Sequence, residues 1–215
     1  GELYRWQIVE ALERFWPDFS HSNEYLPENE AAERPNKINH CQHYAYEKIL
    51  EYFQDVSREV GQDPIIIADP GCMVKVADQL DAKFAIGSSV AVASGISKAG
   101  SRRKVAAFFG DSAFFHSTIP AICNATVNQS ELLMILLDNR GAASTGLQPS
   151  MGTGRGVFGN PAPKLSIPEI ARACGVKFVR HLDADVSEVE IQAAFQEGLN
   201  FPGVGLVIVP LSREP

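Results

Sequence analysis

The chain has 215 residues, of which 45% are hydrophobic, with a formal net charge of −7. This length suffices for one α/β domain with a full core. The acidic balance disfavours nucleic acid or an anionic membrane as the main partner, and no apolar run reaches the roughly 18 residues of a membrane span. The N-terminus lacks a signal-peptide core. The four widely spaced cysteines, Cys41, Cys72, Cys123 and Cys174, predict reduced thiols of a cytoplasmic protein.

The first 37 residues are predicted to stand apart from the rest. Residues 3–16 carry apolar side chains at helical spacing, and Pro17 ends that helix. Residues 17–37 are polar with two prolines, which favours a linker or an arm. We therefore expect an N-terminal helix and linker over 1–37 and a compact domain over 38–212.

Apolar strand-like runs alternate with helical patterns through the compact domain. The helical segments are predicted over 42–59, 73–80, 90–98, 166–174 and 186–198. The strands are predicted over 64–68, 83–86, 104–109, 132–137, 176–180 and 205–209. This alternation, with continuous rather than alternating apolar strands, predicts an α/β fold: a three-layer, doubly wound, mostly parallel sheet.

Polar turns follow two of these strands. The first is Gly110-Asp111-Ser112, and the second is Asp138-Asn139-Arg140-Gly141. Ligands bind at the carboxyl ends of strands in open parallel sheets, and a carboxylate and an amide oxygen are both hard ligands suited to Mg²⁺. The alternatives are a helix N-cap for Asp111 and an Asx-turn for Asn139.

Together the two turns resemble the thiamin-diphosphate signature, Gly-Asp-Gly followed after a spacer by Asn-Asn. The segments 110–117 and 138–149 are more similar to the thiamin-binding part of indolepyruvate:ferredoxin oxidoreductase. More broadly they resemble 2-oxoacid:ferredoxin oxidoreductases and sulfopyruvate or phosphonopyruvate decarboxylases. Ser112 departs from the third glycine of the signature. The resemblance covers roughly residues 38 to 210 and implies the thiamin-diphosphate-binding fold of the diphosphate type.

The resemblance also implies the residues of the site. Asp111, Asn139 and the carbonyl of Gly141 would hold Mg²⁺, and His116 and His43 are the candidates for proton transfer. The remaining positions would contact thiamin diphosphate: Gly71, Cys72, Gly87, Ser88, Ser89, Gly110, Ser112, Ala113 and Thr145, together with Asp111, Asn139 and Gly141. For the turn 87–89 the expected contacts are backbone N–H groups and serine hydroxyls, against the alternative of an ordinary tight turn.

Some relatives bind an iron–sulfur cluster through a Cys-x-x-Cys segment, the Gly-Cys turn and a later cysteine. Here Ile38 replaces the first cysteine of that segment, whereas Cys41 and Cys72 remain. Because such clusters are normally held by four thiolates, we expect no iron–sulfur cluster in this chain.

The resemblance implies a subunit or domain of a 2-oxoacid:ferredoxin oxidoreductase of the indolepyruvate type, acting by oxidative decarboxylation through the C2 carbanion of the cofactor. The expected partners are a pyrimidine-type thiamin-binding domain or subunit, a 2-oxoacid, and ferredoxin reached through another subunit, in a homo- or hetero-oligomer. The alternatives are a non-oxidative 2-oxoacid decarboxylase and a non-catalytic domain that retains the fold. A dinucleotide-binding domain is disfavoured, because no Gly-x-Gly-x-x-Gly follows residue 68.

Overall fold

The computed structural model describes residues 12–16, 41, 45–156 and 159–211. Two units are distinguished, Gly1–Ile38 and Asn39–Pro215. In the first unit residues 12–15 are helical, which is the end of the predicted helix over 3–16. The rest of that helix and the predicted linker over 17–37 lie outside the described residues.

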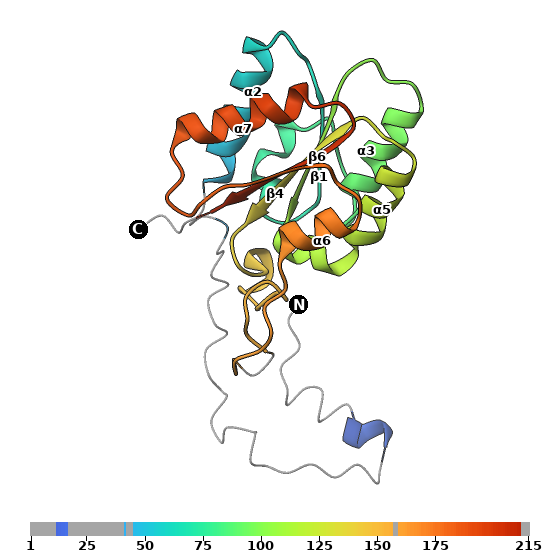
Figure 1. Cartoon of the computed structure of the whole chain (residues 1–215). Helices are drawn as coiled ribbons and strands as arrows, with labels where there is room; N and C mark the ends of the chain where they lie inside the picture. Colours follow the sequence, from blue (N-terminus) through green and yellow to red (C-terminus); the bar gives the residue numbers. More distant parts are fainter. Residues whose placement is uncertain (1–11, 17–40, 42–44, 157–158, 212–215) are drawn as a thin grey trace. The chain divides into compact units, whose positions relative to one another are not determined.

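The described strands form one six-stranded sheet in the order β2-β1-β3-β4-β6-β5, and all neighbours are parallel. The predicted α/β fold with a parallel sheet is therefore confirmed (Figure 1). Their bounds are β1 (Ile65–Ala68), β2 (Ala82–Lys83), β3 (Val105–Gly110), β4 (Leu132–Asp138), β5 (Phe178–His181) and β6 (Val204–Pro210).

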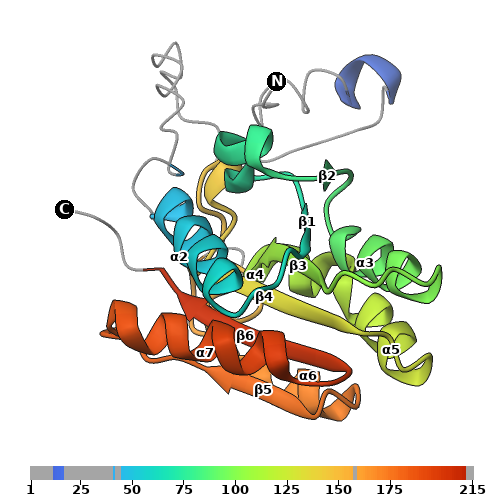
Figure 2. The ribbon, with the colours of Figure 1, turned by 90° about the horizontal axis from the view of Figure 1, so that it is seen from above.

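Helices cover both faces of the sheet, as the view from above shows (Figure 2). One face carries α2 (Tyr46–Glu59), the 3₁₀ helix η3 (Cys72–Gln79) and α7 (Glu188–Asn200). The other carries α3 (Ser89–Lys98), α5 (Ile119–Val127) and α6 (Ile167–Ala173). A short α4 (Asp111–Ala113) and a π-helical turn η4 (Phe114–Thr118) lead from β3 into α5, and a 3₁₀ turn η5 (Ala143–Thr145) follows β4.

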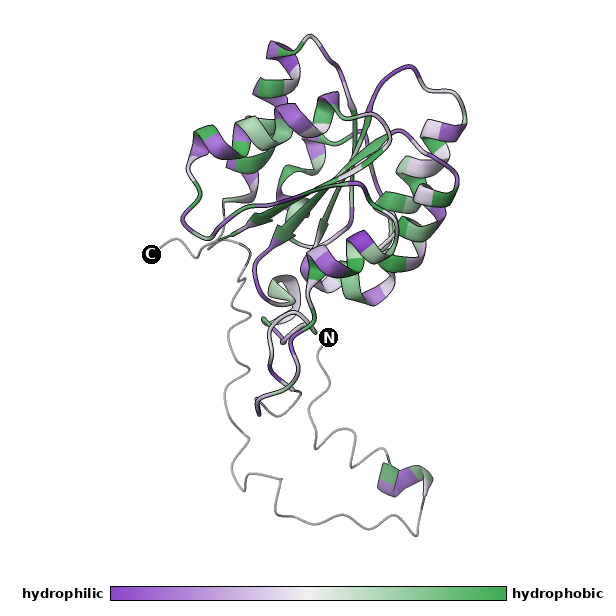
Figure 3. Cartoon of the chain, viewed as in Figure 1, coloured by the Kyte–Doolittle hydropathy of each residue, from purple (hydrophilic) through white to green (hydrophobic). Residues whose placement is uncertain are grey.

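The strands are apolar throughout because each buries both faces. On β4, Leu133, Ile135 and Leu137 belong to the core under α2 and α7. Leu132 and Met134 belong to the core on the opposite side. Hydropathy colouring shows the apolar sheet enclosed by helices with mixed outer faces (Figure 3). Such continuous apolar runs are typical of parallel sheets covered on both sides.

Several predicted elements differ from the structure in bounds or type. The helix expected over 73–80 is the 3₁₀ helix η3, and the strand expected over 176–180 is Phe178–His181. The strand expected over 83–86 is instead Ala82–Lys83, and Phe84 and Ile86 are exposed beyond it. The helix expected over 186–198 is Glu188–Asn200, because Ser187 and Glu190 form a capping box that fixes its start. Among the described residues, no helix is long and apolar enough to cross a bilayer.

Two helical glycines allow a matched test of how closely α7 packs on the sheet. A Cβ at Gly198 would lie 2.7 Å from a methyl carbon of Leu133, which is fully buried, whereas a Cβ at Gly95 in α3 would meet nothing within 4 Å. Overpacking costs about 1–3 kcal/mol, and alanine gains about 1 kcal/mol over glycine in a helix. Urea denaturation should therefore find Gly198→Ala less stable than the parent and Gly95→Ala at least as stable. Equal stabilisation by both would show that α7 has room to move.

Candidate functional site

A cleft lies at the carboxyl ends of β1, β3 and β4, where the sequence places its polar turns. Its lining comes from the segments that follow β1, β2, β3 and β4 and from the first residue of α2: Tyr46, Asp69 to Met73, Ile86, Phe109 to Ala113, Leu137, Asn139 and Gly141 to Thr145. The cleft encloses about 100 Å³. Pockets that bury a whole drug-sized ligand are roughly 300–1,000 Å³, so this cleft can enclose only part of a cofactor.

Asp111 and Asn139 meet at the floor of the cleft because β3 and β4 are neighbours. Gly110, the last residue of β3, pairs with Leu137, one residue before the end of β4, so that the two strands end within one residue of the same level. The side-chain amide atom of Asn139 that faces Asp111 lies 3.0 Å from Asp111 Oδ1 and 2.6 Å from the carbonyl oxygen of Gly141. The other amide atom lies 2.6 Å from the hydroxyl oxygen of Tyr46.

The Asn139 amide can lie in two orientations. With its oxygen toward Asp111, that oxygen faces only acceptors, namely Asp111 Oδ1 and the carbonyl oxygen of Gly141. With its nitrogen toward Asp111, the NH₂ group donates to both Asp111 and Gly141. Octahedral Mg²⁺ holds its ligands at 2.0–2.1 Å, which places adjacent oxygens about 2.9 Å apart. The first orientation therefore fits a bound divalent cation, and the second fits the same residues without one.

Gly141 lets the chain bend around this point. Its φ of +154° and its closeness to Gln148 leave no room for a side chain, since a Cβ would lie 2.9 Å from the Gln148 carbonyl oxygen. Ala142 N–H donates to that same carbonyl at 2.9 Å, which closes the loop after β4. The glycine is thus required by the close approach of two backbone segments.

Asp111 is a buried carboxylate, 2% exposed, at the start of the helical segment that follows β3. Ser150 donates its hydroxyl to Asp111 Oδ2 at 2.6 Å, so the loop after β4 also contacts the site. Burial raises the pKa of Asp111 to about 6, the Ser150 hydrogen bond opposes this rise, and the charge of Asp138 adds to it. A cation beside Asp111 would favour the ionised form.

The Ser112 hydroxyl adds a donor to the same place. It lines the cleft, and its oxygen is buried with no hydrogen-bond partner among the described residues. Unpaired buried polar atoms are uncommon in proteins and call for an explanation such as an absent ligand. A phosphate oxygen would accept from this hydroxyl.

The turn 87–89 does not line the cleft, although Ile86 does. Asp69, 2% exposed, accepts the N–H of Gly87 at 2.8 Å through Oδ2 and the N–H of Ser89 at 2.8 Å through Oδ1. These two N–H groups are therefore occupied by Asp69, and the Ser89 hydroxyl is buried with no hydrogen-bond partner among the described residues. The cofactor contacts expected of Gly87, Ser88 and Ser89 remain predictions. Ser88 directs its hydroxyl to the carbonyl of Ala85. Asp69 fixes this turn beside the cleft, and burial raises the pKa of its carboxyl group.

Some of the other predicted positions line the cleft and some do not. His116 lies on the π-helical turn, is exposed and does not line the cleft, and His43 lies outside the described residues. The predicted roles of both remain predictions. The predicted cofactor and metal positions that do line the cleft are Gly71, Cys72, Gly110, Asp111, Ser112, Ala113, Asn139, Gly141 and Thr145.

Cys41 and Cys72 are joined by a disulfide, with their Cα atoms 5.2 Å apart. The expectation of four reduced thiols is therefore wrong for this pair. The reason is spatial: Cys41 precedes α2, Cys72 begins η3, and both helices pack on the same face of the sheet. Their sequence separation of 31 residues gives no sign of this contact. Cys123 and Cys174 are free.

Three residues of the site were missed by reasoning from sequence. Tyr46 has the spacing of an ordinary core residue of α2, and Ser150 lies in a loop without a pattern. Asp69 could have been noticed as an acid directly after a buried strand. No group of three or more His, Cys, Asp or Glu side chains able to hold a metal occurs among the described residues. The predicted cation ligands include only one side chain of these types, Asp111; the others are the amide of Asn139 and the carbonyl of Gly141.

Residues 74–209 match the family model described as "Thiamine pyrophosphate enzyme, C-terminal TPP binding domain". The chain is 40% identical over 162 residues to indolepyruvate oxidoreductase subunit IorA of Methanothermobacter marburgensis, covering 72% of this chain and 25% of the relative. It is 38% identical over 143 residues to the subunit of the same name from Pyrococcus abyssi, covering 60% and 22%. The chain thus spans about a quarter of the length of these curated relatives.

Solved structures share the fold. The 2-oxoglutarate:ferredoxin oxidoreductase from Magnetococcus marinus superposes with a TM-score of 0.72 at 18% identity, covering 80% of this chain and 63% of that one. Benzoylformate decarboxylase from Polynucleobacter necessarius gives a TM-score of 0.57 at 18% identity, covering 80% and 34%. The resemblance to indolepyruvate oxidoreductases that the motifs indicated is confirmed by the curated relatives.

The raised pKa of Asp111 has a consequence for the cation-free chain. Because the folded chain holds this proton up to about pH 6 whereas the unfolded chain releases it near 3.8, the stabilisation is complete below pH 4 and lost as the pH rises through 6. A shift of this size corresponds to at most about 3 kcal/mol, because an Asn139 NH₂ group that donates to Asp111 opposes the rise. In EDTA, Asp111→Asn should therefore be more stable than the parent at pH 7.5, by up to about 3 kcal/mol. The difference should vanish near pH 4.

Urea denaturation of both proteins from pH 4 to 8 measures this difference directly. Groups that do not interact with Asp111 titrate alike in both chains and cancel; Asp138, whose charge acts on Asp111, does not. A difference that does not change with pH would mean that Asp111 is ionised throughout and that its burial costs nothing.

Proposed function

The chain belongs to the family of C-terminal TPP-binding domains of thiamine pyrophosphate enzymes, and we propose that it holds the diphosphate end of thiamin diphosphate through Mg²⁺ in a 2-oxoacid oxidoreductase of the indolepyruvate type. Thiamin diphosphate is the same compound as thiamine pyrophosphate. The observation that carries the proposal is that the inner amide atom of Asn139 lies 3.0 Å from Asp111 Oδ1 and 2.6 Å from the Gly141 carbonyl oxygen, in a cleft that the unpaired hydroxyl of Ser112 also lines.

The donor set fits magnesium. One carboxylate, one amide oxygen and one backbone carbonyl are hard oxygen ligands, and Mg²⁺ typically takes its remaining positions from water and phosphate. The Ser112 hydroxyl and the first N–H groups of the helical segment beginning at Asp111 would face the phosphate oxygens. Burial and the nearby charge of Asp138 raise the pKa of Asp111. A bound cation would offset both effects and favour the ionised carboxylate.

The site is proposed to be one half of a catalytic centre. The cleft encloses about 100 Å³, and Ile86, which lines it, is 43% exposed. A pyrimidine-type domain, from another chain or from another part of a longer protein, would cover the rest of the cofactor. The curated relatives are about four times as long as the part matched here, which leaves room for such a domain in proteins of this kind.

Bound thiamin diphosphate supplies the electron sink for decarboxylating a 2-oxoacid. The residues of this chain would hold the diphosphate in place, keep Asp111 ionised and exclude water from the floor of the cleft. We propose an aryl or branched 2-oxoacid as substrate and ferredoxin, reached through another subunit, as the electron acceptor. This proposal follows the curated relatives, whose name is indolepyruvate oxidoreductase subunit.

Uptake of thiamin diphosphate should depend on the cation and on Asp111. In equilibrium dialysis the parent chain should retain the cofactor with Mg²⁺ and not with EDTA. Since even outer partners of metal ligands change metal affinity by about 10–100-fold, Asp111→Asn should weaken uptake by at least about tenfold. Asp138→Asn removes the same charge next to the site without removing a proposed ligand, and should weaken it far less.

Equal uptake with EDTA would contradict the magnesium role. Equal loss in both variants would mean that only net charge matters. No uptake by the parent chain with Mg²⁺ would contradict the proposal that the residues of this chain suffice to hold the diphosphate.

The reaction class is tested with the chain joined to the polypeptide that co-purifies with it from its natural source. With coenzyme A present to take the acyl group, indolepyruvate should be consumed, with release of CO₂, only when an oxidised ferredoxin or a viologen dye is also present to take the two electrons. Release of CO₂ together with an aldehyde in the absence of any acceptor would instead indicate a non-oxidative decarboxylase.

A further inference from the structure

Tyr46 contacts the proposed cation site from a different element. It is the first residue of α2, is 4% exposed and lines the cleft. Its hydroxyl oxygen lies 2.6 Å from the outer amide atom of Asn139, across 93 residues of sequence. The inner amide atom of Asn139 faces Asp111 and Gly141. Tyr46 therefore touches the proposed ligand on the side away from the cation.

A tyrosine hydroxyl can partner either end of an amide, because it both donates and accepts hydrogen bonds. When the Asn139 nitrogen faces outward, the hydroxyl accepts from it, and the amide oxygen faces Asp111. When the oxygen faces outward, the hydroxyl donates to it at the same distance. The amide can therefore reverse without leaving its outer end unpaired.

We propose that Tyr46 is a positioning residue that holds the Asn139 amide in either of two orientations. In the empty site the NH₂ group of Asn139 points to the cation position, and in the loaded site the amide oxygen of Asn139 binds the cation. This inference rests on the proposed function of the cleft. Tyr46 would thus contribute to cation binding without being a ligand, and it lies outside the motifs at the strand ends.

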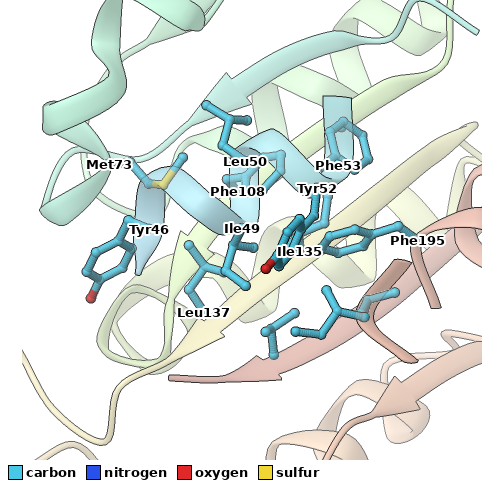
Figure 4. Packing of buried hydrophobic residues seen from close by; sticks show 14 of the residues in the cluster. Tyr46, Ile49, Leu50, Tyr52, Phe53, Met73, Phe108, Ile135, Leu137 and Phe195 are labelled. Atoms are coloured by element: carbon cyan, nitrogen blue, oxygen red, sulfur yellow. The ribbon is translucent and has the colours of Figure 1, made fainter. Parts of the chain in front are cut away.

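The ring of Tyr46 is well placed to act as a fixed support. Figure 4 shows its hydroxyl pointing away from the aliphatic side chains of the core, while Ile49, Leu50 and Phe53 of the same helix pack inward. The ring belongs to the buried core cluster between α2 and the sheet. Residues that orient a metal ligand work best when packing locks their own conformation.

The hydrogen bond should be stronger when the cation is bound. A cation on the amide oxygen draws electron density from the nitrogen, which makes the NH₂ group a better donor toward Tyr46. Loss of the hydroxyl therefore costs more in the loaded site than in the empty one. It also frees the amide to rotate away from the ligand position.

The test uses Tyr46→Phe, which keeps the buried ring and removes only the hydroxyl. The matched control is Tyr52→Phe, because Tyr52 lies on the same helix and its hydroxyl donates to Glu188 on α7 at 2.9 Å, away from the cleft. Mn²⁺ affinity at saturating thiamin diphosphate, measured by electron paramagnetic resonance, should fall by about 10–100-fold in Tyr46→Phe. In Tyr52→Phe the Mn²⁺ affinity should stay within about twofold of that of the parent, because Tyr52 contacts no proposed ligand of the cation.

Asn139→Ala distinguishes a failure of the role proposed for Tyr46 from a failure of the proposed cation site. If Asn139→Ala binds Mn²⁺ as the parent does, the proposed cation site itself is wrong. If Asn139→Ala weakens binding but Tyr46→Phe does not, only the role of Tyr46 is wrong. Adding Tyr46→Phe to Asn139→Ala should cause no further loss, since the hydroxyl acts through the amide; an additional loss of the same size would overturn the proposal.

A second measurement uses the unaltered chain and so does not depend on how a variant folds. In a ¹⁵N-labelled chain, the side-chain NH₂ resonances of Asn139 should shift when Mg²⁺ and thiamin diphosphate are added, because their hydrogen-bond partners change from Asp111 and Gly141 to Tyr46. Resonances that do not move on saturation would show that the amide does not reverse.

Discussion

The parallel pairing of β3 with β4 is the constraint on which the site depends. Gly110 is in register with Leu137, so Asp111 and Asn139 emerge within one residue of the same level on the same edge of the sheet. A carboxylate and an amide far apart in sequence thereby come within 3.0 Å of each other. The pairing is secured by strands that are apolar on both faces, each buried under its own layer of helices. The hydrophobic core thus fixes a polar contact that would not form by itself.

That polar contact is unfavourable when nothing fills it. Asp111 is almost fully buried, and burial together with the charge of Asp138 raises its pKa to about 6. At neutral pH the cation-free chain therefore pays a free-energy cost at Asp111. The carboxylate is either ionised while buried, or protonated at a pH above its pKa. Sites that bind charge commonly carry such a cost, because the same groups that destabilise the empty protein stabilise the bound state. The amide of Asn139, with its NH₂ turned inward, reduces the cost by donating to Asp111 and Gly141.

Much of the fold could be predicted from the sequence, because strand and helix signals in this chain are local. The apolar runs ending at Phe109 and Leu137 gave two of the three strands beneath the cleft, and the turns after them gave the proposed ligands. What the sequence could not supply depends on contacts between distant segments. The two N–H groups of the turn 87–89 bind Asp69, and Cys41 is bonded to Cys72. Tyr46 reads as a core residue, since its apolar ring satisfies the helical pattern while its hydroxyl serves the neighbouring site.

Tyr46 and Cys72 both line the cleft and connect it to α2 and to the segment before it. The disulfide joins the segment before α2 to the turn after β1, and the Tyr46 hydroxyl joins the start of α2 to the loop after β4. The segment before α2 and the first residue of α2 are thus each bonded to a loop that lines the cleft. In the proposed reversal only the Asn139 side chain would need to rotate, because the Tyr46 hydroxyl can partner either end of the amide from the same position.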